Sequence, residues 1–179
     1  MLGIFKLKVR SASLVLASLL FAEIASAQPV PPANSNIPFL VTFGKEANKT
    51  YGDDDYSQVF FLSIPVSETD PFYIRVFDPD VGGEYDEVYG GIDTKTKFSI
   101  YGGQGAWSTP DAQLTDPKGN YKAGTLLDSR SFGESEKYDN AWYSFGPLDP
   151  KEGEYIKDFN AHVFKIVSEG TQGNDGNLY

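Results

Sequence analysis

The stretch PFYIRVFDPDVGGEYDE, residues 71–87, decides the fold class, because an apolar run with strand-like alternation ends in it at a dense group of acids. Phe72, Ile74 and Val76 occupy alternate positions, which places them on one face of an extended strand. The next ten residues, 78–87, carry five carboxylates. Such a loop is either a solvated acidic turn or a site for a cation.

Further short runs, rich in aromatic and β-branched residues, are separated by Gly, Pro and Asp in the same way. The predicted strands are residues 39–43, 57–64, 71–77, 96–102, 125–132, 140–146 and 160–167. No window of ten or more residues has a helical period. The sequence therefore predicts an all-β fold, an antiparallel β-sandwich of about seven to eight strands that forms a single domain over residues 39–179.

The first 27 residues have the pattern of a secretory signal peptide, with a basic segment, an apolar segment and an A-x-A cleavage pattern that ends at Ala27. Glu23 leaves the apolar run short of the roughly 20 residues that span a bilayer. We expect an exported protein, in a periplasmic, cell-surface or extracellular location, with no membrane insertion after cleavage. Residues 28–38 are rich in proline and are expected to form an extended lead-in.

The chain is strongly acidic and contains no cysteine. Its net charge of −10 becomes −12 when the three basic residues and one acid of residues 1–27 are removed. This charge repels phosphate backbones and anionic lipids, which argues against nucleic-acid binding. Without disulfides, the stability of an exported domain must come from packing, or from packing plus a metal ion.

The acidic loop has the features of a calcium site. Calcium takes six to eight oxygen ligands, and carboxylates on a tight turn supply several together. Gly82 and Gly83 allow the backbone to fold back, so that acids before and after them can face one ion. The spacing does not fit an EF-hand. The predicted ligands in this loop are Asp78, Asp80 and Asp86, with Glu84 as a further candidate.

Residues 74–91, IRVFDPDVGGEYDEVYGG, resemble the calcium loops of C2-type β-sandwiches, in which an apolar strand ends at a first aspartate. The resemblance implies that a second loop completes the ligand set. The candidates for that loop are Asp53, Asp54 and Asp55, for which a solvated turn is the better interpretation, and Asn174, Asp175 and Asn177, for which an ordinary turn remains an equal alternative. The basic patch with which many C2 domains dock on membranes is absent.

The chain as a whole is similar to exported bacterial β-sandwich proteins without an assigned activity, which share segments such as RVFDPDxGG, TKFSxYGG and GxDGNLY. The resemblance implies that such proteins continue beyond DGNLY. A C-terminally truncated sandwich and a natural, frayed terminus are therefore both open interpretations.

Catalysis is not expected. The chain has one histidine, His162, within an alternating strand pattern, and neither a cysteine nor a G-x-S-x-G nucleophile motif. The predicted role is structural or adhesive, with an unknown protein or glycan as partner and calcium as the cofactor. A carbohydrate-binding module is the alternative, with Trp107 and Tyr101 as stacking residues. A third possibility is an acidic surface domain that binds no metal.

Overall fold

The computed structural model describes residues 40–48, 56–116 and 118–179. The predicted signal peptide, the lead-in and the three acids at 53–55 lie outside these ranges. The strands are β1 (Val41–Phe43), β2 (Ser57–Pro65), β3 (Phe72–Phe77), β4 (Lys95–Gly102), β5 (Thr125–Phe132), β6 (Trp142–Leu148), β7 (Glu154–Ile156), β8 (Ala161–Gln172) and β9 (Gly176–Leu178). Single 3-10 turns, η2 (Pro150–Glu152) and η3 (Lys157–Phe159), flank β7. Across the described ranges there is no helix that could cross a membrane.

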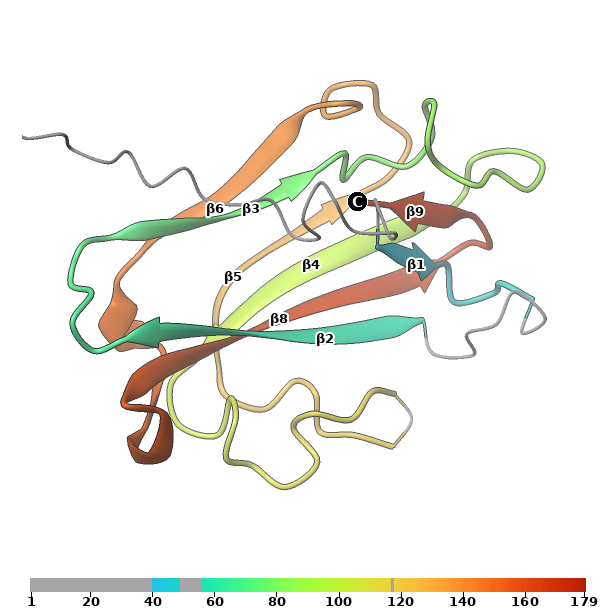
Figure 1. Ribbon diagram of the computed structural model, residues 1–179. Coiled ribbons are helices and arrows are strands. Elements are labelled where there is room, and N and C mark those ends of the chain that lie inside the picture. Colours follow the sequence, from blue (N-terminus) through green and yellow to red (C-terminus); the bar gives the residue numbers. More distant parts are fainter. Residues whose placement is uncertain (1–39, 49–55, 117) are drawn as a thin grey trace, which may run out of the picture.

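The largest sheet is antiparallel and has the strand order β2-β8-β4-β5, with the short β7 also paired to β8. The long β8 is its central strand, where Ile166 lies opposite both Phe60 of β2 and Ile100 of β4. Two two-stranded sheets, β3-β6 and β1-β9, complete the fold. Figure 1 shows β3 and β6 crossing over one face of the large sheet, whereas the loop between β4 and β5 lies beyond its other face.

This architecture confirms the predicted all-β sandwich, with nine strands in the described residues where about seven to eight were expected. The two strands that the sequence did not predict, β7 and β9, have three residues each. A run of three residues is too short for period-2 alternation to stand out. Both strands depend on partners that are already in place, β8 for the first and β1 for the second.

The main core lies between the large sheet and the β3-β6 pair. As predicted, Val76 of β3 points inward and is 8% exposed, whereas Tyr73 on the opposite face is 56% exposed. Phe72 packs edge-on against Phe164 of β8, with 5.1 Å between ring centroids. The fully or almost fully buried residues of this core are Val76, Phe98, Ile100, Phe132, Phe145, Leu148 and Phe164. Each such side chain contributes about 1.5–3 kcal/mol through burial.

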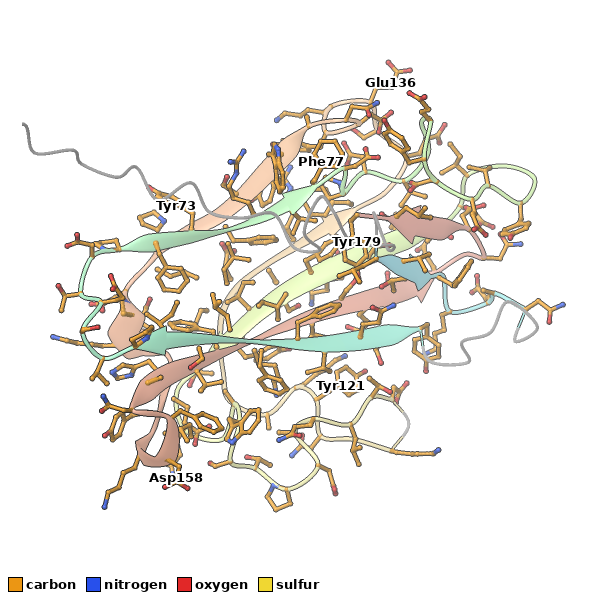
Figure 2. The ribbon with its side chains drawn as sticks, viewed as in Figure 1. Tyr73, Phe77, Tyr121, Glu136, Asp158 and Tyr179 are labelled. Carbon is orange, nitrogen blue, oxygen red and sulfur yellow. The ribbon has the colours of Figure 1, made fainter. Side chains whose placement is uncertain are left out.

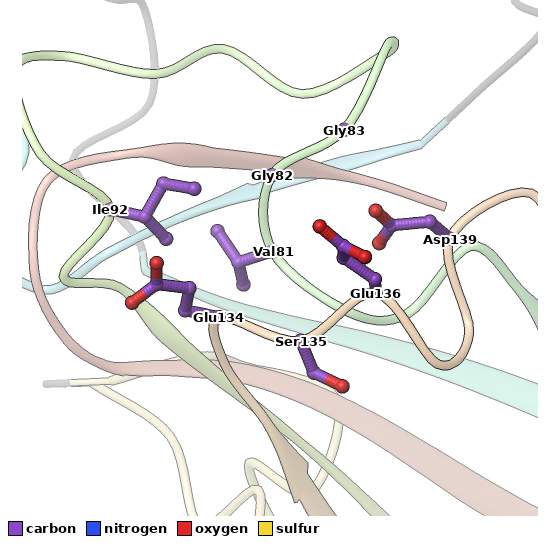
Figure 3. Close-up of a pocket in the computed structure, with 8 residues that line it drawn as sticks. All are labelled: Val81, Gly82, Gly83, Ile92, Glu134, Ser135, Glu136 and Asp139. Atoms are coloured by element: carbon purple, nitrogen blue, oxygen red, sulfur yellow. The ribbon is translucent and has the colours of Figure 1, made fainter.

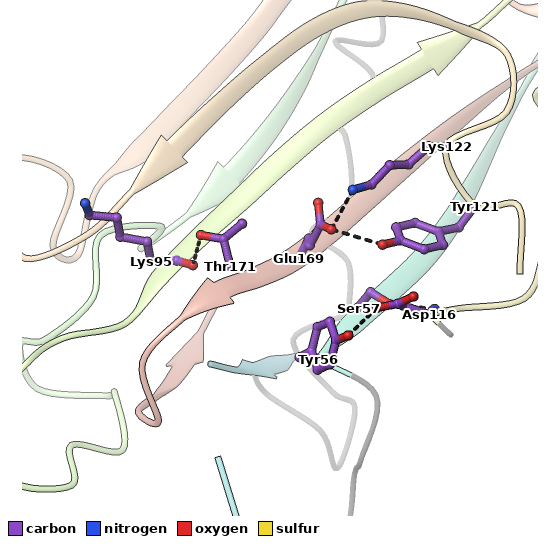
Figure 4. A network of polar contacts seen from close by, with 8 residues as sticks. All are labelled: Tyr56, Ser57, Lys95, Asp116, Tyr121, Lys122, Glu169 and Thr171. Carbon is purple, nitrogen blue, oxygen red and sulfur yellow. Dashed lines mark hydrogen bonds and ion pairs between the residues drawn. The ribbon is translucent and has the colours of Figure 1, made fainter. Parts of the chain in front are cut away.

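The opposite face of the large sheet is covered by the β4–β5 loop and includes polar groups. Tyr121 of this loop donates a hydrogen bond to Glu169 of β8, at 3.0 Å, and Lys122 forms an ion pair with the same carboxylate at 2.8 Å (Figure 4). Asp116 accepts a hydrogen bond from Tyr56. These contacts hold the loop on the sheet.

Three distant segments meet at one end of the sandwich. The amide of Asp78, just after β3, donates to the carbonyl of Ala141 before β6, at 2.9 Å. Glu87 and Gly176 exchange two backbone hydrogen bonds of 2.9 and 2.8 Å, which place the acidic loop beside β9. The loops after β3, before β6 and around β9 therefore form one surface.

Candidate cation site

Asp78 directly follows β3, where these loops meet. Its side chain is 1% exposed, and its backbone has a φ of 51°. The carboxylate oxygen Oδ1 accepts a hydrogen bond from the amide of Asn140 at 2.8 Å, whereas Oδ2 is buried and has no hydrogen-bond partner. Burial, and to a lesser degree the charges of Asp139 and Asp80, raise the pKa of Asp78. The structure thus buries an acceptor without supplying a donor.

Two more buried oxygens also have no hydrogen-bond donor. Asn177 of β9 is fully buried, and its Nδ2 donates to the carbonyl of Pro79 at 2.9 Å, which leaves its Oδ1 without a donor. Asp139 also has a buried oxygen, Oδ1, that has no partner. Burial and the charges of Asp80 and Glu136 raise the pKa of Asp139. Hydrogen bonds from Asp78 to Ala141 and from Asn177 to Pro79 connect the segments that carry these three acceptors. A cation bound among them would satisfy all three together, which makes them candidate ligands.

Asp80 and Asp86, the other predicted ligands, border this group and already accept hydrogen bonds. Asp80 accepts from the amide of Tyr138 at 2.8 Å. Asp86 accepts from the amides of Gly82 and Leu178, both at 2.7 Å. Burial raises the pKa of Asp86 to about 7 despite these donors, with the charges of Asp78 and Asp139 acting in the same direction. The carboxylates of both acids thus lie beside the group of unpaired oxygens but already have backbone donors.

Asp175 has a different role from the predicted one. It is fully buried, and its two oxygens accept hydrogen bonds from the amides of Tyr89, Asp93 and Thr94 at 2.8, 3.0 and 3.2 Å. Burial alone would raise its pKa, but these donors outweigh burial and lower the pKa. Asp175 therefore anchors the loop before β4. Glu84 is exposed on the acidic loop and does not belong to the buried group.

The acids alone do not form a metal cage. Within the three described ranges, no group of three or more His, Cys, Asp or Glu side chains is arranged to hold a metal ion. Among the described residues, the buried side-chain oxygens without a donor are those of Asp78, Thr96, Asp139, Asn174 and Asn177, and the candidate site uses two carboxylates and one amide of this set, on Asp78, Asp139 and Asn177. Calcium would need further oxygens from carbonyl groups, water or a ligand to reach six to eight.

Asp139 was missed by sequence reasoning because it lies far along the chain from the acidic loop. The signal available was the Tyr-Asp-Asn turn at 138–140, directly before β6. Only the pairing of β3 with β6, which sets Phe77 opposite Trp142, brings this turn to Asp78. The pairing could not be read from local patterns.

A cleft of about 380 Å³ adjoins the cation site (Figure 3). Asp139 forms part of its wall and faces Gly83, where an added Cβ would lie 3.0 Å from Asp139 Oδ2. Ile92 contributes apolar surface, whereas Val81 is only 1% exposed. The complete lining is Val81, Gly82, Gly83, Ile92, Glu134, Ser135, Glu136 and Asp139.

The two residues predicted to stack on sugars do not form an open platform. Tyr101 is buried under the β4–β5 loop, at 7% exposure. Trp107 is half-buried, with its ring edge-on to Phe61 at 4.8 Å and to Phe159 at 5.3 Å. More open rings lie elsewhere, for instance that of Tyr73 on the outer side of β3, labelled in Figure 2.

Known proteins give no information about this site. No family model, no curated protein and no solved structure matches this chain.

Proposed function

We propose that this chain is an exported β-sandwich domain that binds a calcium ion at its strand-end loops and has a structural or adhesive role. The observation that carries the proposal is the group of three buried acceptor oxygens, on Asp78, Asp139 and Asn177, that have no hydrogen-bond donor. An unsatisfied buried polar group costs about 1–3 kcal/mol, and more when it is charged. A bound cation would remove this cost.

Calcium is favoured over other metals by the type of ligand. The free groups are all hard oxygens, which suit calcium and magnesium, whereas zinc and copper sites draw on nitrogen and sulfur. The chain has no cysteine, and its one histidine, His162, lies on β8 and pairs with Ile64 and Tyr155. Calcium also accepts irregular geometry more readily than magnesium does.

A cation here would have a mechanical effect on the fold. It would connect the end of β3, the start of β6 and the strand β9, through Asp78, Asp139 and Asn177. These segments are far apart in sequence, so one ion would cross-link all three into one rigid surface. Such a surface is suited to a fixed contact with a neighbouring domain or an external partner, and this is the basis of the structural or adhesive role.

Thermal unfolding of the exported chain in excess EDTA, in millimolar Ca²⁺ and in millimolar Mg²⁺ tests the proposal. A ligand that binds only the native state adds about 2.7 kcal/mol at a hundredfold excess over Kd, which shifts the midpoint by several degrees in a domain of this size. We expect that shift with Ca²⁺. The variants Asp78→Ala and Asp80→Ala are expected to lose it, and so is Asp139→Ala.

The matched control is Asp158→Ala, at an exposed position of η3 outside the site, and it should retain the full calcium response. A folded wild type without any calcium shift would contradict the proposal and favour an acidic surface domain without metal. Full retention of the response by Asp78→Ala would show that calcium binds elsewhere.

A further inference from the structure

We infer that the cleft beside the cation site binds a neutral sugar, and that calcium is required because the sugar's hydroxyl groups complete the calcium shell. This inference rests on the proposed function, and it adds a ligand class and a second set of residues. The bound unit would be a pyranose ring with two adjacent hydroxyl groups, at the end of a glycan or within it.

The incomplete ligand set is the first argument. Of the five buried side-chain oxygens without a partner in the described residues, the candidate site uses three, those of Asp78, Asp139 and Asn177, whereas calcium takes six to eight. Asp139 belongs to both sites, since its Oδ1 is one of the unpaired oxygens and its side chain forms a wall of the cleft. Through Asp139, a ligand in the cleft would approach the ion, and two of its hydroxyl oxygens would complete the calcium shell.

The lining of the cleft is the second argument. Ile92 provides apolar surface for the C–H face of a sugar ring, and Glu134, Ser135 and Glu136 provide hydrogen-bonding groups for its hydroxyls (Figure 3). A carboxylate accepts from a hydroxyl through a charge-assisted hydrogen bond, which is among the stronger kinds. A few polar groups around an apolar patch are typical of small-ligand sites.

The two glycines keep this cleft open. Gly82 and Gly83 have φ angles of 117° and 80°, which side chains rarely adopt. A Cβ on Gly82 would lie 2.8 Å from the Ile92 Cδ1 atom, and one on Gly83 would lie 3.0 Å from Asp139. Any larger residue would thus press against the cleft wall and the candidate ligand at the same time.

Charge disfavours anionic ligands in the cleft. Three carboxylates, those of Glu134, Glu136 and Asp139, line the cleft. In a chain with a net charge of −10, they repel phosphates, sulfates and uronates. A basic ligand such as a lysine side chain would compete with calcium for the same carboxylates, so it would bind better in EDTA. A sugar that coordinates the ion shows the opposite dependence.

The test is an NMR titration of the ¹⁵N-labelled exported chain with the methyl glycosides of glucose, galactose and mannose. Methyl glucuronide and lysine amide serve as charged comparators. In millimolar Ca²⁺ we expect at least one neutral glycoside to shift the amide signals of Gly82, Gly83 and Ser135 in a saturable way, and EDTA to abolish these shifts. Glu136→Gln and Ser135→Ala should weaken the binding several-fold while the calcium-induced rise in melting temperature stays. The control Ser129→Ala, on the exposed edge strand β5, should change neither.

The outcomes separate the two proposals. A normal calcium shift in melting temperature, with no response to any neutral glycoside, overturns the sugar inference and leaves the calcium site intact. The inference is also overturned if lysine amide binds in EDTA more strongly than any glycoside binds in calcium. That result would favour a basic ligand. If calcium itself has no effect on stability, the proposed function fails and the inference fails with it.

Discussion

Asp175 is buried and Asp86 half-buried on neighbouring loops, and the two acids behave in opposite ways. Both accept hydrogen bonds from backbone amides, Asp175 from three and Asp86 from two. The pKa of Asp175 is lowered, whereas burial raises the pKa of Asp86 to about 7 with help from the charges of Asp78 and Asp139. Burial by itself therefore does not mark a binding site. A binding site is marked instead by a buried charge that has too few hydrogen-bond donors around it.

The same contrast appears on the other face of the large sheet. Glu154 is buried, yet the hydroxyl of Ser108 and the amides of Trp107 and Ser108 outweigh burial and lower its pKa. Lys165, on β8, is fully buried, and its Nζ has no hydrogen-bond partner. Burial lowers the pKa of Lys165 to about 8, against the opposing effect of Glu154. One hydrogen-bonded charge thus lies near one that has no hydrogen bond and lies over the ring of Tyr101, 5.3 Å from its centroid.

Removal of the satisfied acid should have the largest effect. Asp175→Ala leaves the amides of Tyr89, Asp93 and Thr94 without their acceptor, so we expect a loss of about 3 kcal/mol in the free energy of unfolding. Urea unfolding in EDTA measures it, with Asp70→Ala at an exposed position as control. A loss below about 0.5 kcal/mol, the range of ordinary surface substitutions, would refute the anchoring role.

Removal of the unsatisfied lysine should instead stabilise the protein. Lys165→Met keeps the side-chain length without the buried charge, and we expect a gain of about 2 kcal/mol at pH 7. The folded pKa of about 8 is below the unfolded value of about 10.4, so wild-type stability rises as the pH rises between them. The gain should therefore shrink above pH 8 and vanish above about pH 10.

Urea unfolding of both proteins across this pH range measures that difference. Lys118→Met, at an exposed position, is the control and should show no pH-dependent gain. A Lys165→Met variant that is less stable than wild type at pH 7 would mean that the amine has a partner in solution.

The smallest effect is expected at Asp86. Because its folded pKa of about 7 lies above the unfolded value of about 3.9, it contributes stability that is present below about pH 4 and is lost as the pH rises through 7. In EDTA, the free energy of unfolding should fall with pH by about 1 kcal/mol less in Asp86→Asn than in wild type, after allowance for solvent screening. Unfolding at pH 4.5 and pH 8 measures it, and parallel pH profiles for wild type and variant would contradict the expectation.

Sequence reasoning located the candidate site in part. Asp78, Asp80 and Asp86 could be predicted because they lie in one short loop after a strand with clear alternation. Asp175 was correctly seen as a residue close to that loop, but its amide partners were invisible in the sequence. Asp139 could not be predicted at all, since its approach to Asp78 depends on the pairing of β3 with β6.

The sequence by itself determined the all-β class, the inward face of strands such as β3 and the acidity of the loop that follows it, because alternation and composition are local properties. Only the tertiary structure decided which acids are satisfied. The number of amide donors around Asp175, and the absence of a donor at Asp78 Oδ2, follow from how distant segments pack together. The free energy of a buried charge depends on those neighbours and not on its own residue type.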